Sequence, residues 1–489
     1  MNFLREGEKT VAIDREAQEK FQTLKELGKA IFAESSIVRE GIVRDSDVTL
    51  AKKFLSKATQ AAKPKVWSFY WEHVFLAPAI GRKLAGEAVK RGLNVNPAEV
   101  EFLLWLHDIG RLISPSDYLR NEFIGDLLLK GVGIPQEIRK SIPSQQKLLM
   151  TGEKMLCSKE QLRFKEPLNG AQRKIAHAYV ESQSETERII NLADNLGKRG
   201  PKGLFTMDGF IEYLRIGEGR YQQEGSWASV RWAIPRRKAG AVLQVAAIED
   251  TAQWLSQTGI DFEDIRKEFI HYGPKFVIVV RHGELDNPEG KLYSRDAIMA
   301  PQDIMHLSKM GEKQMKDVAG VIQERKFHCV RIDVSPETRT QESMRELQKQ
   351  LNVSTQRTVD DLDDTYAPGP YVEGVKMREF QQMSGDVYDS RRWGNYNHEQ
   401  PVNIVARMKK AVHDMSEDLR VGQAGVILSH GDPIAWLLNS IASDTMPEPK
   451  NLRSALYPAK GQAVAIIFDS ENTFFAAYTL NEIVTPNVY

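Results

Sequence analysis

Residues 276–284 read F-V-I-V-V-R-H-G-E, and the second half of the chain is organised around them. Five apolar, mostly β-branched residues are followed at once by Arg281, His282, Gly283 and Glu284. The apolar run is too short for a helix core and predicts a buried parallel strand. Open α/β sheets bind their ligands at the carboxyl ends of such strands. The arginine offers a planar fork of donors and the glycine lets an anion approach the backbone, so this strand end predicts a phosphate site with a histidine nucleophile.

Two other predicted strands end in comparable polar motifs. The residues S-P-E-T-R, ending at Arg339, follow one strand, and His430-Gly431-Asp432 follows another. If the strands are parallel, these motifs and His282 meet at one edge of the sheet. We predict strands at 276–280, 328–334, 425–429, 463–468 and 474–478, with helices between them, for example at 309–325 and 403–419. This alternation predicts a three-layer α/β domain.

The ordered motifs resemble branch one of the histidine phosphatase (phosphoglycerate mutase-like) superfamily. They are R-H-G-E at 281–284, L-S-K-M-G-E-K-Q at 307–314, S-P-E-T-R at 335–339 and S-H-G at 429–431. The resemblance implies an α/β/α domain that hydrolyses phosphomonoesters through a phosphohistidine. It implies that His282 is the nucleophile, that Arg281, Arg339 and His430 hold the phosphate, and that no cofactor is needed.

The general acid is less clearly marked. Branch-one members usually supply a glutamate from an L-x-E segment, whereas this chain has D-D-L-D-D at 360–364. Asp364 is the best match, with Asp363, Asp361 and then Asp432 as alternatives. No loops for a bisphosphate substrate are recognisable, so a phosphatase is preferred to a mutase.

Three further residues are predicted to contact substrate. They are Glu284, beside the nucleophile, and Arg391 and Arg392 in the segment R-R-W-G-N-Y-N-H-E-Q. For the two arginines an exposed basic turn is an equal alternative.

The first half of the chain, residues 1–272, is predicted to be almost entirely helical. Apolar residues recur every three or four positions. Helices are expected at 14–33, 67–91, from Asn96-Pro97 through V-E-F-L-L-W-L-H-D-I-G-R-L to 112, at 241–254 and at 262–270, with an irregular excursion or hairpin in 197–240. The Gly273-Pro274 turn, where the pattern changes, predicts two domains at 1–272 and 273–489.

Polar residues interrupt these apolar helices at His73, at His107-Asp108 and at Asp194. Burying such groups costs several kcal/mol unless they are paired or bind a metal. Each alone could be a hydrogen-bonded core residue. Together, imidazole and carboxylate suit a divalent ion such as Mn, Fe, Ni or Zn, with Mg also open.

The order H…H-D…D over about residues 65–198, with its L-H-D-I-G-R segment, resembles the HD-domain family of metal-dependent phosphohydrolases. The resemblance implies a helical bundle in which His73, His107, Asp108 and Asp194 hold a metal that activates water. His177 is the only histidine between Asp108 and Asp194. A mononuclear site is therefore favoured.

Composition limits the remaining classes. The chain has 489 residues, 66 Lys+Arg and 66 Asp+Glu, so its net charge is zero and nucleic acid is disfavoured as a partner despite basic clusters at 198–202 and 236–238. Two cysteines, no apolar leader and no membrane-length apolar run predict a soluble cytoplasmic enzyme.

The combined prediction is a bifunctional phosphohydrolase acting on a small phosphorylated metabolite or nucleotide. Alternatives are that one domain is a nucleotide-sensing module that regulates the other, or that the C-terminal domain is a phosphoprotein phosphatase or a mutase. The substrate and the oligomeric state, a homo-oligomer included, stay open.

Overall fold

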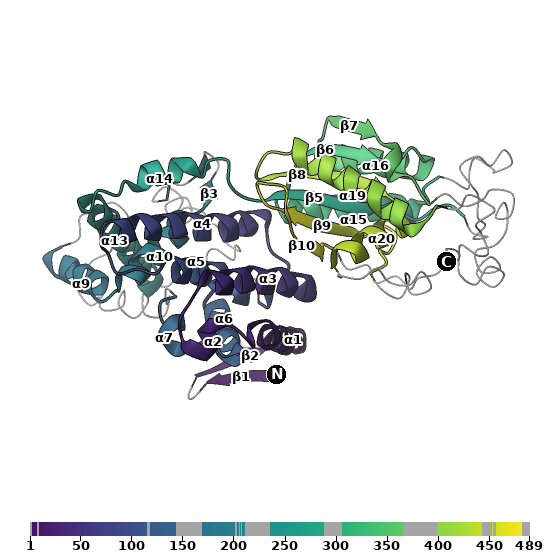
Figure 1. The fold of residues 1–489 in the computed structure, drawn as a ribbon. Helices are drawn as coiled ribbons and strands as arrows, with labels where there is room; N and C mark the ends of the chain where they lie inside the picture. Colours follow the sequence, from purple (N-terminus) through teal and green to yellow (C-terminus); the bar gives the residue numbers. More distant parts are fainter. Residues whose placement is uncertain are drawn as a thin grey trace. The chain divides into compact units, whose positions relative to one another are not determined.

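A computed structural model shows two compact units, Met1–Gly273 and Pro274–Tyr489 (Figure 1). The structure describes residues 2–6, 9–114, 118–142, 169–200, 203–204, 206, 208–210, 235–287, 306–365, 399–442, 452 and 456–481. Among the helices of these residues, none is both long and apolar enough to cross a bilayer.

The N-terminal unit opens with an antiparallel hairpin of β1 (Asn2–Glu6) and β2 (Lys9–Ile13), and is helical for most of its remaining described length. The expectation of an almost entirely helical unit is wrong at this hairpin. The short apolar runs F-L at 3–4 and V-A-I at 11–13 are separated by polar residues and a glycine. Such a pattern can form two strands joined by a turn.

The helices of this unit start where the sequence supplies caps. Asp14 accepts a 2.7 Å hydrogen bond from the Ala17 amide at the start of α1 (Arg15–Phe32), and Asn96 caps α5 (Pro97–Leu106), which has proline at its first position. The others are α2 (Ser36–Glu40), α3 (Asp45–Ala62), α4 (Ser68–Lys90), α6 (Tyr118–Val132), α7 (Gln136–Arg139), α9 (Gly170–Glu181), α10 (Glu185–Leu196), α13 (Pro235–Gln257) and α14 (Phe262–Glu268), together with the short strands β3 (Arg199–Gly200) and β4 (Gly203–Leu204).

Helix α4 packs along both α5 and α10, while α1 and α5 pack on α3. Phe32 of α1 lies in the centre of this core, where its ring contacts Phe54 of α3 and Phe102 of α5 edge-on. The packing of α10 (Glu185–Leu196) on α4 brings a segment that is distant in sequence against the consecutive helices α4 and α5.

The helix expected to run to residue 112 ends earlier. Helix α5 stops at Leu106, and a short 3-10 helix, η1 (Ile109–Leu112), follows. Gly110 of η1 lies against the backbone of α6, where an added Cβ would come within 1.9 Å of the Asn121 carbonyl oxygen. His107 and Asp108 therefore lie in the turn between α5 and η1, and not within an apolar helix as expected.

The C-terminal unit is built on a six-stranded mixed sheet in the order β10-β9-β5-β8-β6-β7. The strands are β5 (Lys275–Arg281), β6 (His328–Val334), β7 (Thr355–Thr358), β8 (Gln423–Ser429), β9 (Ala463–Phe468) and β10 (Phe474–Thr479). Strands β5, β8, β6 and β7 are parallel to one another. Strand β9 pairs antiparallel with β5, and β10 pairs antiparallel with β9. The predicted strands lie where expected. Strand β7 was missed because its T-Q-R-T sequence is exposed at the sheet edge and has no apolar pattern.

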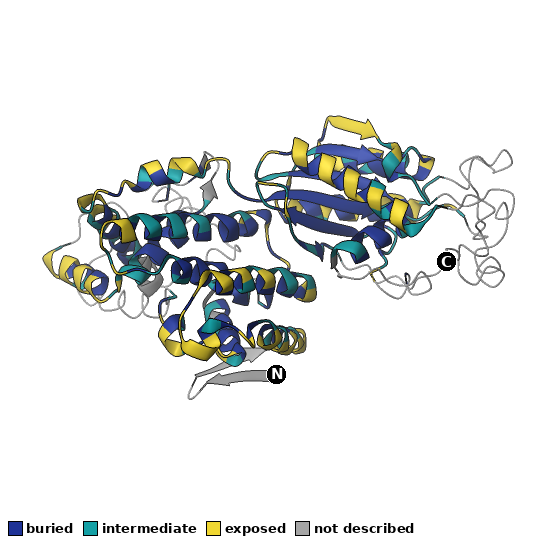
Figure 2. Ribbon diagram, in the orientation of Figure 1, coloured by how far each residue is buried: buried dark blue, intermediate teal, exposed yellow. Residues whose placement is uncertain are grey.

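Helices cover both faces of the sheet (Figures 1 and 2). Right-handed crossovers place α15 (Lys309–Glu324) and α16 (Thr338–Leu351) on one face and α19 (Pro401–Asp418) on the other, because the chain moves along the sheet in opposite directions through them. Val277 and Val279 of β5 pack against residues of α19 and of α20 (Gly431–Ala442), while Phe276, on the opposite face, contacts Phe327. In this unit the structure shows the expected three-layer α/β arrangement.

Candidate functional site

The three polar motifs of the C-terminal unit meet at the carboxyl ends of neighbouring parallel strands. Strand β8 lies between β5 and β6. The His282 amide donates to the Ser429 carbonyl at 3.1 Å, and the Ser335 amide donates to the Leu428 carbonyl at 3.1 Å. The end of β8 thus holds His282 and Ser335, which follow the two neighbouring strands, in register.

His282 is buried, with 5% of its surface exposed. Its Nδ1 lies 2.8 Å from the Gly283 carbonyl oxygen. Since a carbonyl only accepts, Nδ1 carries the hydrogen and Nε2 carries a lone pair. Burial, and next the positive charge of Arg339, hold the pKa of His282 well below its usual value. The imidazole is therefore neutral at neutral pH, the form in which Nε2 can attack phosphorus.

Arg339, from the first turn of α16, lies at the centre of the site. Its Nε donates to His430 Nδ1 at 3.2 Å, its Nη1 to Glu337 at 2.9 Å and its Nη2 to Asp364 at 2.8 Å. Only 9% of its side chain is exposed. These contacts fix the guanidinium plane, so its direction toward a bound anion is preorganised.

His430 precedes α20 and is almost fully buried. Because Arg339 Nε is a donor, His430 Nδ1 accepts, and Nε2–H donates to Ser335 Oγ at 2.8 Å. Burial and then Arg339 lower the pKa of His430 well below its usual value. Both ring nitrogens thus contact protein groups in this structure, which gives His430 a role in orienting Arg339 besides the phosphate contact predicted for it.

Arg281 closes the other side of the site. Its Nη1 donates to the Pro458 carbonyl at 2.9 Å, and its guanidinium lies 5.2 Å from the centre of the Tyr457 ring. Its Nε is buried and has no hydrogen-bond partner among the described residues. A buried, unsatisfied guanidinium donor is costly unless an anion binds it.

The acidic segment that ends at Asp364 lies beside these groups. Asp364 Oδ2 is 2.8 Å from Arg339 Nη2 and 3.5 Å from His430 Nδ1, and 44% of this side chain is exposed. Asp363 accepts a 3.3 Å hydrogen bond from Ser335 Oγ, and Asp361 pairs with the exposed Lys410 at 3.0 Å. Of the three aspartates, Asp364 combines contact with the phosphate-site arginine and access to solvent.

The remaining predicted residues contact other side chains or are not described. The Glu284 carboxylate pairs with Lys460 at 2.6 Å. Asp432 accepts a 2.7 Å hydrogen bond from the Tyr457 hydroxyl. Arg391 and Arg392 lie outside the described residues.

The L-S-x-x-G-x-x-Q motif supports the residues that follow β5. Ser308 caps α15 by accepting from the Gly311 amide, and Gln314 accepts a 2.8 Å hydrogen bond from the Glu284 amide. Gly283 and Gly311 pack backbone to backbone, where a Cβ on Gly283 would lie 2.6 Å from the Gly311 carbonyl oxygen. The motif is recognisable in the sequence, but its packing against Gly283 and its hydrogen bond to the Glu284 amide are visible only in the structure.

Two supporting residues had not been identified from the sequence. Ser343 Oγ accepts a 3.2 Å hydrogen bond from the Gly283 amide, and Arg407 of α19 contacts the segment that contains Asp364. Ser343 falls within the T-Q-E-S residues that follow Arg339, which was the available signal. No signal marked Arg407 among the other basic residues of its helix.

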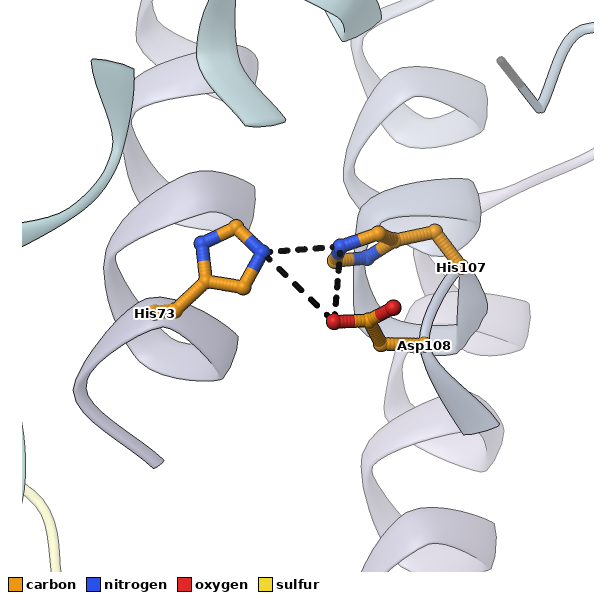
Figure 3. Close-up of side chains that lie close together, drawn as sticks. All are labelled: His73, His107 and Asp108. Atoms are coloured by element: carbon orange, nitrogen blue, oxygen red, sulfur yellow. Dashed lines mark hydrogen bonds and ion pairs between the residues drawn. The ribbon is translucent and has the colours of Figure 1, made fainter. Parts of the chain in front are cut away.

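In the N-terminal unit, His73 of α4 lies against His107 and Asp108 (Figure 3). The two Nε2 atoms are 2.9 Å apart, and Asp194 Oδ1 of α10 lies 3.1 Å from His73 Nε2 and 3.2 Å from His107 Nε2. Asp108 Oδ2 lies 3.9 Å and 3.7 Å from the same two nitrogens. The structure thus brings together all four residues predicted to bind metal.

The hydrogen bonds of the two Nδ1 atoms determine which ring nitrogen of His73 and of His107 carries the hydrogen. His73 Nδ1 lies 3.1 Å from the Gly197 carbonyl, and His107 Nδ1 lies 2.7 Å from the Leu104 carbonyl. Both carbonyls accept, so each Nδ1 carries the hydrogen and, in the neutral rings, each Nε2 presents a lone pair. Two imidazole nitrogens and two carboxylates that converge in this way form a ligand set of the kind that binds a cation. The four residues therefore fit a divalent ion with nitrogen and oxygen ligands.

The four side chains of this cluster interact electrostatically with one another. Burial, and next Lys198, lower the pKa of His73. Burial alone would lower the pKa of His107, but Asp108 and Asp194 outweigh it and raise that pKa. Burial would raise the pKa of Asp194, but Lys198 and His107 outweigh it and hold the pKa well below its usual value. His177 of α9 is exposed and pairs with Glu181.

Comparison with known proteins bears on the C-terminal unit. Residues 277–465 match the histidine phosphatase superfamily (branch 1). Similar solved structures include mycobacterial hydrolase 1, which is 14% identical and whose match covers 42% of this chain and 96% of that chain with a TM-score of 0.33. Mycobacterial glucosyl-3-phosphoglycerate phosphatase is 15% identical, and its match covers 42% of this chain and 96% of that chain with a TM-score of 0.32. Bacillus stearothermophilus YhfR is 18% identical, and its match covers 41% of this chain and 95% of that chain with a TM-score of 0.33. A sequence comparison with curated proteins found no match.

The family match covers strands β6, β7 and β8 and most of β5, the crossover helices and all three strand-end motifs, and it ends within β9. The C-terminal unit is a histidine phosphatase superfamily domain of branch 1. The protein is an enzyme that hydrolyses phosphate esters.

Proposed function

We propose that the C-terminal unit hydrolyses a phosphomonoester of a small metabolite or nucleotide through a phosphohistidine at His282. The observation that carries the proposal is the neutral, buried His282, whose Nδ1–H bonds the Gly283 carbonyl and leaves the Nε2 lone pair for attack. Arg281 and Arg339 supply the positive charge for the phosphate oxygens.

In the first step His282 Nε2 attacks phosphorus and a phosphorus–nitrogen bond forms. The bond from phosphorus to the ester oxygen breaks, and Asp364 transfers a proton to the departing alcohol. The phosphate oxygens compete with the Asp364 carboxyl group for Arg339 Nη2, because both accept from that donor, and the carboxyl group displaced from the guanidinium takes up from solvent the proton that it then transfers. Binding of the phosphate thereby releases Asp364 to bond the leaving oxygen.

In the second step Asp364 takes a proton from water as the water attacks phosphorus. The phosphorus–nitrogen bond breaks, inorganic phosphate leaves and His282 regains its lone pair. Asp364 is then protonated and ready for the next substrate.

Rapid-quench labelling tests this mechanism directly. Full-length protein mixed with ³²P-labelled substrate should give an acid-labile, base-stable phosphoenzyme that is absent from His282→Ala. Turnover by wild-type protein without that adduct, or turnover by the His282→Ala variant, would refute the proposal.

The N-terminal cluster supports a second candidate function. We propose that His73, His107, Asp108 and Asp194 hold one divalent ion, chosen from Mn, Fe, Ni, Zn and Mg, in a phosphohydrolase of the HD type. The supporting observation is the 2.9 Å approach of two Nε2 atoms whose ring hydrogens lie on the opposite nitrogens. A bound ion would supply an activated water at neutral pH.

In this site the Gly197 and Leu104 carbonyls orient the two imidazoles, and Arg111 Nε holds Asp108 Oδ2 at 2.8 Å. Metal content by mass spectrometry tests the proposal. Wild-type protein should carry about one equivalent, the number that one mononuclear site predicts. His107→Ala and Asp194→Ala should carry almost none, and full occupancy in either variant would refute the site.

A further inference from the structure

Arg407 of α19 makes an unusual set of contacts with the acidic segment. Its Nη1 donates to the carbonyl oxygens of Asp361 and Asp363, each at 2.8 Å, and its Nη2 donates to the Asp364 carbonyl at 3.3 Å. One guanidinium therefore binds three backbone oxygens of a segment that is not regular secondary structure beyond Leu362.

A second residue holds Arg407 in place. Its Nε and Nη2 donate to the two oxygens of Glu399 at 2.6 Å and 2.9 Å, a bidentate pair. Only 15% of the Arg407 side chain and 18% of the Glu399 side chain are exposed. The geometry is thus rigid, and a lysine could not reproduce it, because an ammonium lacks the planar fork of donors.

The segment is also fixed on its other side. Leu362 is fully buried, and its carbonyl accepts a 2.7 Å hydrogen bond from Ser429 Oγ at the end of β8. Between the Ser429 and Arg407 contacts the backbone has little freedom to turn. The direction of the Asp364 side chain toward Arg339 and His430 then follows from where these two anchors hold its backbone.

We propose that Arg407 is a positioning residue for the general acid, holding the 361–364 backbone so that Asp364 reaches the leaving group. This inference rests on the role proposed above for Asp364. The Arg407 guanidinium binds the backbone carbonyl oxygens of the segment and not the Asp364 carboxylate. Arg407 therefore acts by positioning Asp364 and does not itself touch the reacting atoms.

The test compares two substrates that differ in their need for an acid. The phenolate of p-nitrophenyl phosphate leaves with little protonation, whereas the alkoxide of glycerol 2-phosphate needs a proton. In the full-length protein, Asp364→Asn should slow glycerol 2-phosphate by about 100-fold or more, the usual size of an acid's contribution, and p-nitrophenyl phosphate far less. Arg407→Met should show the same selectivity with a smaller loss, about tenfold or more for glycerol 2-phosphate.

Lys410→Met is the matched control. Lys410 lies on the same helix and also contacts the segment, but through the half-exposed Asp361 carboxylate at 3.0 Å. This variant should keep both activities within about twofold, as expected for an exposed ion pair. Arg407→Lys keeps the charge without the fork and should fall between Arg407→Met and the wild type.

A double variant separates positioning from a general structural effect. Arg407→Met combined with Asp364→Asn should be no slower on glycerol 2-phosphate than Asp364→Asn alone, because the positioned group is already absent. Equal slowing of both substrates by Arg407→Met, or losses that multiply in the double variant, would overturn the inference.

Failure of the mechanism itself would give a different result. Activity surviving in His282→Ala would refute the phosphohistidine proposal, whereas failure of the Arg407 inference leaves that variant inactive and changes only the ratio between the two substrates. Equal slowing of both substrates by Asp364→Asn would overturn the acid assignment and this inference with it.

Discussion

Replacing Arg339 with methionine removes the cation at the centre of the C-terminal site. Arg339 Nη1 lies 2.9 Å from Glu337 Oε2, and 9% and 7% of the two side chains are exposed. Removing one partner of a buried ion pair costs about 3–5 kcal/mol. The contact with the half-exposed Asp364 adds less than about 1 kcal/mol. For a domain of this size each kcal/mol lowers Tm by roughly 2–4 °C, so the C-terminal transition should fall by about 6–20 °C.

The same substitution should reduce catalysis by a separate mechanism. Loss of one preorganised donor to developing charge costs about 2.7–4 kcal/mol, or about 100-fold to 1,000-fold in kcat. This loss should appear with p-nitrophenyl phosphate as well as with alkyl phosphates, because the phosphate oxygens are common to both.

Combining Arg339→Met with Glu337→Gln distinguishes the two effects. Glutamine removes the buried carboxylate charge, so calorimetry of the full-length protein should show recovery of most of the lost Tm, while kcat for p-nitrophenyl phosphate stays low. Recovery of activity together with stability would mean that Arg339 serves only the fold. A decrease in Tm below about 2 °C for Arg339→Met alone would refute the reasoning about the buried pair.

Three other predictions follow from the structure. The pKa values of His282 and His430 are held well below the usual 6.5 by burial and then by Arg339, so below that pH the unfolded chain binds more protons than the folded one. The free energy of unfolding of the C-terminal unit should therefore decrease as the pH is lowered, by up to about 1.4 kcal/mol per histidine per pH unit below about pH 6. Urea unfolding at several pH values should give a shallower dependence of this free energy on pH for His282→Gln than for the wild type. An unchanged dependence would contradict the prediction. Removing divalent metal with a chelator should lower the Tm of the N-terminal unit, since metal at about 100 times its Kd stabilises by about 2.7 kcal/mol, whereas His107→Ala should not respond. Residues 275–489 expressed alone should stay soluble and hydrolyse p-nitrophenyl phosphate; aggregation would show that the two units share a core.

Much of the C-terminal fold could be predicted from local pattern. The apolar run 276–280, the other strand runs and the helical periodicity between them mark most elements, because burial on both faces of a strand requires a continuous apolar run. The residues that flank those runs gave the candidate site, since the carboxyl ends of parallel strands meet at one edge. The four candidate metal ligands of the N-terminal unit were predicted from polar groups in apolar surroundings, and the structure brings these four side chains within contact distance.

Other features depend on contacts between residues far apart in the chain. The position of β8 between β5 and β6 brings His430 next to Arg339, and no local periodicity encodes strand order. The end of α5 at Leu106 depends on the close approach of η1 to α6, which places His107 and Asp108 in a turn. The contact of Asp364 with Arg339 depends on the contacts that α16, α19 and β8 make with the segment. Residue type and spacing therefore indicated the chemistry, whereas the orientation of each group was decided only when packing brought Arg339, Arg407 and Ser429 around the same short loop.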